Sequence, residues 1–208
     1  MISSAANVLP SAAPEGGKAR RTYEALLRAC GEELAATGSF SAERVAARSG
    51  TSPATFYAYL GSKDAALAAV FSRALDRLVE VVERELSVER LLERGLPRLC
   101  RDFAAAAAAY FGEQSLVFRC ALARLPGSRA LREVYRAHER VVFERYRRFL
   151  ELGRAAGKLR DAEPAGLAQA LLVVTEGLNN PLVVGRGPDD PLVVELGDVV
   201  CRLLAPRA

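Results

Sequence analysis

Hydrophobic residues recur at intervals of three and four along almost the whole chain, which is the spacing of one face of an α-helix. No segment shows the alternation of apolar and polar positions that is typical of a half-buried β-strand. The pattern therefore predicts an all-α protein with about nine helices. Between residues 18 and 37 the apolar positions of this kind are Tyr23, Leu26, Leu27, Cys30 and Leu34.

Capping residues and turn residues divide this pattern into segments. Ser41 and Ser52 each precede a short apolar segment, and Pro53 stands at a first helical position, where its missing N–H costs nothing. Pro97 falls inside a longer pattern, where we expect a bend because proline cannot continue the backbone hydrogen bonds. The expected helices span residues 18–37, 41–49, 52–59, 63–86, 88–111, 113–124, 128–156, 164–178 and 192–204.

Residues 41–64, SAERVAARSGTSPATFYAYLGSKD, are the most informative stretch of the chain. Two short helices with serine caps are expected on either side of Gly50, which is the form of a helix-turn-helix motif. Such a motif places its second helix in the DNA major groove. The same segment carries positive charge: residues 18–63 hold seven basic and four acidic residues, in a chain whose net charge is only +4. A surface with slightly more arginine than glutamate would give the same count.

The order of residues around the turn is also specific. A glycine, a capping serine, a Thr-Phe-Tyr run, a second tyrosine and a lysine follow one another at fixed spacing from Gly50 to Lys63. This segment resembles the recognition unit of TetR-family transcriptional regulators, and residues 18–71 are similar to the DNA-binding domain of that family. Two positions depart from the pattern: Ala42 stands where the family often has threonine, and Leu60 where it usually has phenylalanine.

The resemblance and the helix geometry together imply a DNA-contacting set. Ala54 and Thr55 are expected near base edges, whereas the tyrosine hydroxyls and Lys63 are expected on phosphates. Two arginines four residues apart on the first short helix are expected along the DNA backbone, and core packing is the alternative role for Tyr59. The full expected set is Arg44, Arg48, Ser52, Pro53, Ala54, Thr55, Tyr57, Tyr59 and Lys63.

The last two expected helices are apolar over a wide arc, which indicates burial or contact with a partner. We expect them to form the interface of a homodimer through Leu171, Val174, Leu178, Leu196, Val200 and Leu203.

A run of alanines, Ala104–Ala109, followed by two aromatic residues suggests room for a hydrophobic or aromatic small molecule, although close packing on a neighbouring helix explains it equally well. For the single histidine, a core position with satisfied hydrogen bonds is the alternative to ligand contact. The expected effector pocket is lined by Phe103, Tyr110, Phe118, Tyr135 and His138.

The cysteines Cys30, Cys100, Cys120 and Cys201 are widely spaced, and histidine occurs once, so the sequence predicts no disulfide framework, no metal site and no cofactor. Residues 1–17 lack the apolar core of a signal peptide and are expected to form a flexible arm. No apolar stretch approaches the length of a membrane span. We therefore expect a cytoplasmic protein with reduced thiols.

These observations favour a DNA-binding domain over residues 18–63 and a helical domain for effector binding and dimerisation over residues 64–208. The expected function is a repressor that a small apolar effector releases from a palindromic DNA operator. A transcriptional activator or a co-repressor-dependent regulator of the same fold is the alternative. A helical enzyme is disfavoured, because no glycine-rich phosphate loop, no G-x-S-x-G motif and no metal-binding histidine pair is present. The helix-turn-helix motif argues against a plain small-molecule-binding protein.

Overall fold

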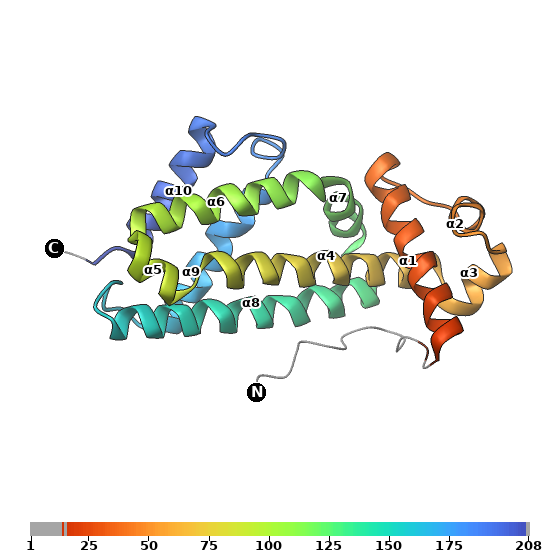
Figure 1. Cartoon of the computed structure of the whole chain (residues 1–208), viewed down its shortest axis with the longest axis horizontal. Coiled ribbons are helices and arrows are strands. Elements are labelled where there is room, and N and C mark those ends of the chain that lie inside the picture. Colours follow the sequence, from red (N-terminus) through yellow and green to blue (C-terminus); the bar gives the residue numbers. More distant parts are fainter. Residues whose placement is uncertain (1–13, 15, 207–208) are drawn as a thin grey trace. The chain divides into compact units, whose positions relative to one another are not determined.

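A computed structural model describes residue 14 and residues 16–206, and this part of the chain is built from helices alone, without a β-strand (Figure 1). The prediction of an all-α fold is confirmed. The expected arm at residues 1–17 lies, except for Pro14, Gly16 and Gly17, outside the described residues. The helices are α1 (Gly17–Thr37), α2 (Ala42–Ser49), α3 (Pro53–Leu60), α4 (Lys63–Glu85), α5 (Val88–Arg94), α6 (Leu96–Glu113), α7 (Ser115–Arg124), α8 (Arg129–Ala155), α9 (Pro164–Glu176), the 3-10 helix η1 (Gly177–Asn179) and α10 (Pro191–Leu204).

The expected single helix over residues 88–111 is wrong, because the chain forms two helices there. Gly95 adopts a backbone φ of 74° that side chains disfavour, and its N–H closes α5 on the carbonyl of Leu91. Pro97 is the second residue of α6, where no helical hydrogen bond needs its N–H. The break therefore occurs at the glycine, and the proline begins a helix instead of bending one.

The chain packs as two compact units. The first unit contains the described residues up to Asp76 together with Gln114–His138, and the second contains Arg77–Glu113 and the described residues from Glu139 onward. Because α4 and α8 are long, each contributes residues to both units. The predicted domain boundary at residue 64 stays a prediction.

The core of the first unit is formed by the apolar stripe of α1 and by aromatic side chains of α4, α7 and α8. The ring of Phe71 packs edge-on against Phe118, with centroids 5.4 Å apart, and stacks on Tyr135 at 6.3 Å. Rings in these arrangements add to the free energy gained from burying their area. The α1 residues predicted to be internal are all buried, namely Tyr23, Leu26, Leu27, Cys30 and Leu34.

The second unit is organised by the contact between α6 and α10. Gly197 allows this contact, because a Cβ atom at that position would lie only 2.9 Å from the Cα of Arg101. Beside it, the guanidinium of Arg101 donates two hydrogen bonds to the carboxylate of Asp198, at 2.9 and 3.3 Å. The buried hydroxyl of Tyr146 lies 3.0 Å from Thr175 Oγ1, which ties α8 to α9 inside the same unit.

Candidate DNA-binding site

Local capping interactions define the two short helices. The Ser41 hydroxyl accepts the N–H of Arg44 at 3.2 Å and begins α2, and the Ser52 hydroxyl accepts the N–H of Thr55 at 3.1 Å and begins α3. Gly50 ends α2 in the left-handed conformation, with φ at 66°. Each boundary follows from residues within the motif itself, since serine caps satisfy helical N–H groups and glycine adopts a positive φ at low cost.

α3 has a buried face and an exposed face. Phe56 and Leu60 are 0% and 4% exposed, and the Phe56 ring lies 6.2 Å from that of Phe40. On the opposite side Tyr57 is 47% exposed and leans edge-on against Phe56. This division leaves one side of α3 open to a partner while the other is fixed to the unit.

Most residues of the expected DNA-contacting set lie on or next to this exposed face. Ser52, Pro53, Ala54 and Lys63 are exposed, whereas Thr55 and Tyr59 are half-buried. The hydroxyls of Thr55 and Ser52 lie 2.9 Å apart, so that of Thr55 is also part of the helix cap.

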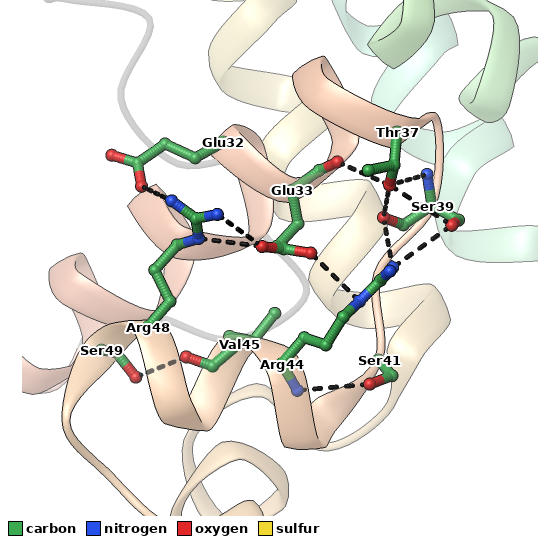
Figure 2. A network of polar contacts seen from close by, with 9 residues as sticks. All are labelled: Glu32, Glu33, Thr37, Ser39, Ser41, Arg44, Val45, Arg48 and Ser49. Carbon is green, nitrogen blue, oxygen red and sulfur yellow. Dashed lines mark hydrogen bonds and ion pairs between the residues drawn. The ribbon is translucent and has the colours of Figure 1, made fainter.

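Glu33 of α1 holds both arginines of α2, as Figure 2 shows. Glu33 is 7% exposed, and its carboxylate lies 3.1 Å from Arg44 Nε. It accepts a hydrogen bond from Arg48 Nε at 2.9 Å and forms an ion pair with Arg48 Nη2 at 2.7 Å. Arg48 also reaches Glu32 at 3.4 Å, and Arg44 donates to the Ser39 carbonyl at 3.0 Å. The hydrogen bond and the charge of Glu33 raise the pKa of Arg48 above its usual range. These five residues connect α1 to α2 in a polar network, named here the Glu33 network.

Glu33 is absent from the set predicted by sequence, which assigns its two arginine partners to the DNA backbone. The guanidinium groups of Arg44 and Arg48 already have carboxylate partners, although the two side chains remain 48% and 45% exposed. A signal was present in the sequence. Glu33 lies three residues after Cys30 and directly before Leu34, and therefore on the buried stripe of α1, where an acidic residue requires a cationic partner.

Positive charge also lies on the outer side of α1, in the same unit. Arg20, Arg21 and Arg28 are exposed there and line a shallow pocket together with Gly16, Gly17 and Glu24. The carboxylate of Glu24 contacts Arg73 of α4 at 2.6 Å. The α1 arginines contribute to the local positive charge of this region, but the expected DNA-contacting set does not include them.

Three residues of the expected effector pocket belong to the first unit. Phe118 and Tyr135 pack on Phe71 in its aromatic core. His138 is 5% exposed; its Nδ1 lies 2.9 Å from the carbonyl oxygen of Val134 and its Nε2 lies 2.8 Å from Asp76 Oδ1. Burial alone would lower the pKa of His138, but the hydrogen bonds to Asp76 and Val134 and the charge of Asp76 raise it above the usual value. Both ring nitrogens face acceptors, which favours the doubly protonated ring.

The other two members of that set, Phe103 and Tyr110, are buried in the second unit. The Phe103 ring packs edge-on against Tyr146 at 6.5 Å. All five residues are therefore at least partly buried within their units, and their role as a pocket lining stays a prediction.

The expected dimer interface stays a prediction, and its six members differ in exposure. Leu171, Leu178 and Val200 are 0%, 1% and 1% exposed, because their side chains face the core of their own unit. Of the other members, Val174, Leu196 and Leu203 are half-buried. The apolar side chains that α9, α10 and the segment between them present to solvent are Val173, Leu182 and Val199, which are 69%, 69% and 39% exposed.

Over residue 14 and residues 16–206, no helix has the length and apolar character needed to cross a membrane. The same residues contain no cluster of three or more histidine, cysteine or acidic side chains that could hold a metal ion.

The sequence matches no protein-family model and no curated protein. The fold, in contrast, matches many solved structures. A TetR transcription regulator from Haloarcula marismortui aligns with a TM-score of 0.70 and 19% identity, over 88% of this chain and 95% of that one. NalD, the secondary repressor of the MexAB-OprM multidrug efflux pump in Pseudomonas aeruginosa, aligns with a TM-score of 0.61 and 19% identity, over 89% and 96%. A complex of SmeT with triclosan aligns with a TM-score of 0.61 and 22% identity, over 88% and 91%.

Proposed function

We propose that this chain, which has the fold of TetR-family transcription regulators, is a transcriptional regulator that binds double-stranded DNA through α3. The observation that carries the proposal is the two-faced α3: Phe56 and Leu60 fix the helix to its unit, and the Tyr57 side is open to solvent. In a helix-turn-helix motif this second helix enters the major groove. The match of the fold to transcription regulators supports the same conclusion.

Within this proposal the exposed residues have distinct roles. Ala54 and the methyl group of Thr55 contact base edges, for which a thymine methyl is the apolar partner. Tyr57, Tyr59 and Lys63 contact phosphates and fix the position of α3 without selecting sequence. Arg44 and Arg48 hold α2 on α1 through Glu33 and are positioning residues, in contrast to the role expected from sequence.

Two copies of the chain bind one operator. A two-fold axis repeats α3, so the operator is a near-palindrome whose half-sites are separated by about one helical turn, roughly 34–36 Å. The exposed apolar residues Val173, Leu182 and Val199 supply part of the contact surface between copies, because association removes their apolar surface from water.

A small apolar or aromatic effector releases the protein from DNA. SmeT was solved with triclosan, and NalD is a repressor, and both share this fold. The effector acts by binding the DNA-incompetent arrangement more tightly, since equal affinity for both arrangements would shift nothing. A coupling of roughly 1–3 kcal/mol is typical of such control.

Selection of operator sequences from random duplex DNA by the purified full chain tests the proposal. The expected result is a palindromic consensus that a gel-shift assay confirms, with loss of sequence preference in Thr55→Ala. Binding without sequence preference, or no binding at low salt, would contradict the proposal.

Operator affinity measured with a triclosan-like aromatic probe then tests effector control: weaker binding supports release, and tighter binding makes the ligand a co-repressor.

A further inference from the structure

Two cysteines that are distant in sequence meet where α6 contacts α10. The backbones come closest at Gly197 and Arg101, where a Cβ on the glycine would lie 2.9 Å from the arginine Cα and 3.3 Å from its nitrogen. Cys100 directly precedes Arg101, and Cys201 follows Gly197 by one helical turn on the same face of α10. Burial raises the pKa of Cys100, and the nearby Cys201 adds to this rise.

The surroundings hold the two thiols in place. The paired hydrogen bonds between Arg101 and Asp198 fasten α6 to α10 beside them. Both cysteines are free thiols; Cys100 is buried, and Cys201 is half-buried, so a small solute can reach the latter first. Neither thiol has a role in the proposed DNA or effector contacts.

We propose that Cys100 and Cys201 form an intramolecular disulfide when the protein is exposed to a hydroperoxide. This reaction makes the contact between α6 and α10 a redox modification site. The inference concerns the second unit alone and does not rest on the proposed DNA-binding function.

The reaction takes place in two balanced steps. The Cys201 thiol loses its proton, and its sulfur attacks one oxygen of hydrogen peroxide; the O–O bond breaks, leaving a sulfenic acid, and the departing hydroxide takes up the proton to become water. The Cys100 sulfur then attacks the sulfenic sulfur, the S–O bond breaks, and a second water leaves with the Cys100 proton. Two thiols and one peroxide thus give one disulfide and two waters.

Protonation sets the speed of the first step. Burial raises the pKa of Cys201; the hydrogen bond to Cys100 and the charges of Arg101 and Arg202 oppose this rise, and Asp198 adds to it. Burial likewise raises the pKa of Cys100. Since the thiolate is the nucleophile, the reaction is slow near neutral pH and accelerates as the pH rises.

The disulfide restricts the unfolded chain, because it closes a loop of roughly 100 residues. A loop of that length predicts a rise in Tm of roughly 5–15 °C for a chain of this size, provided that the bond forms without strain. Oxidation therefore has a physical readout that is independent of DNA binding.

The test treats the full-length chain with hydrogen peroxide at pH 7 and pH 9, followed by a count of free thiols and mass spectrometry of digested protein under non-reducing conditions. We expect two of the four thiols to disappear, a cross-linked peptide pair containing Cys100 and Cys201, and faster loss at pH 9. The Tm should rise on oxidation and fall back with dithiothreitol. Cys120→Ser is the matched control, since Cys120 is also half-buried but lies on α7. This variant should still lose two thiols, form the cross-link and show the rise in Tm.

Cys201→Ser should abolish both the cross-link and the rise in Tm; its half-buried position makes it a milder change than Cys100→Ser at the buried thiol. The proposal is overturned if all four thiols survive, if the cysteines gain oxygen without cross-linking, or if the only disulfides join two chains and vanish on dilution. It is also overturned if oxidised wild type and oxidised Cys201→Ser unfold at the same temperature.

Discussion

Glu33 of α1 and Arg48 of α2 meet at one carboxylate oxygen of the glutamate, which accepts a hydrogen bond from Arg48 Nε at 2.9 Å and forms an ion pair with Nη2 at 2.7 Å. The other carboxylate oxygen contacts Arg44 at 3.1 Å. A single buried acid thus connects α1 to both arginines of α2, and α2 in turn precedes the turn that sets the direction of α3. This arrangement has consequences for both stability and DNA binding.

Replacing Glu33 by glutamine should destabilise the protein, because two arginines are then left without the carboxylate that pairs with them. We expect a fall of about 1–3 kcal/mol in the free energy of unfolding, measured with urea. Glu32→Gln is the control: Glu32 is exposed and reaches Arg48 only at 3.4 Å, so its replacement should cost under about 0.5 kcal/mol. Equal costs for the two variants would show that Glu33 has no special role.

The salt dependence of DNA binding should separate phosphate ligands from positioning residues. The slope of log K against log salt concentration changes by about 0.9 for each phosphate of duplex DNA that the protein neutralises. Lys63→Ala should make the slope shallower by about that amount. Arg48→Gln should lower affinity at every salt concentration and leave the slope unchanged, because Glu33 already holds this side chain. A shallower slope for Arg48→Gln would restore the role on the DNA backbone expected from sequence.

His138 should contribute stability that depends on pH. Its pKa in the folded protein is raised, so the contribution is fully present below the unfolded value of about 6.5 and is lost as the pH rises through the folded pKa. Thermal unfolding of wild type and His138→Gln from pH 5.5 to 8.5 measures this effect: the difference in Tm should shrink toward high pH. Asp76→Asn should weaken the same dependence, as Asp76 accepts from Nε2 at 2.8 Å. If the difference in Tm between wild type and His138→Gln grows toward high pH, the pKa of His138 is lowered by folding and the prediction is wrong.

Two apolar residues of α9 should respond oppositely to substitution. Val173 is 69% exposed and Leu171 is fully buried. We expect Val173→Glu to convert the proposed dimer to monomer with little change in the stability of each chain. Leu171→Ala should instead lower the free energy of unfolding by about 2–5 kcal/mol through the cavity it leaves. Analytical ultracentrifugation and urea unfolding provide the two readouts, and a Val173→Glu protein that remains dimeric would place the interface elsewhere.

The sequence predicts those features that depend on residues close to one another along the chain. Ser41, Gly50 and Ser52 act within one turn of their own position, and the helix boundaries predicted from them agree closely with α2 and α3. At Pro97 the same local reasoning failed, because the nearby Gly95 ended the preceding helix first.

Contacts between distant segments were the part that the sequence left open. A wide apolar arc on α9 indicates burial without telling which side faces the chain itself: Leu171 is fully buried within its unit, whereas Val173 is exposed. The partnership of Glu33 with α2 and the approach of Cys100 to Cys201 likewise depend on how helices cross. The spacing of residues along the chain does not say which distant helix will lie opposite each of them.

Gly197 has no side chain, yet it controls whether the thiols of Cys100 and Cys201 can react with each other. Replacing its hydrogen with a methyl group would push α10 away from the backbone of Arg101, and the Cys100 and Cys201 sulfurs would separate with it. A chain carrying Gly197→Ala would keep all four thiols, yet its proposed oxidation chemistry would resemble that of the serine variants. Formation of the disulfide would then depend on residue 197, which carries no reactive atom. Two chains with identical cysteines would differ in how readily hydrogen peroxide cross-links them.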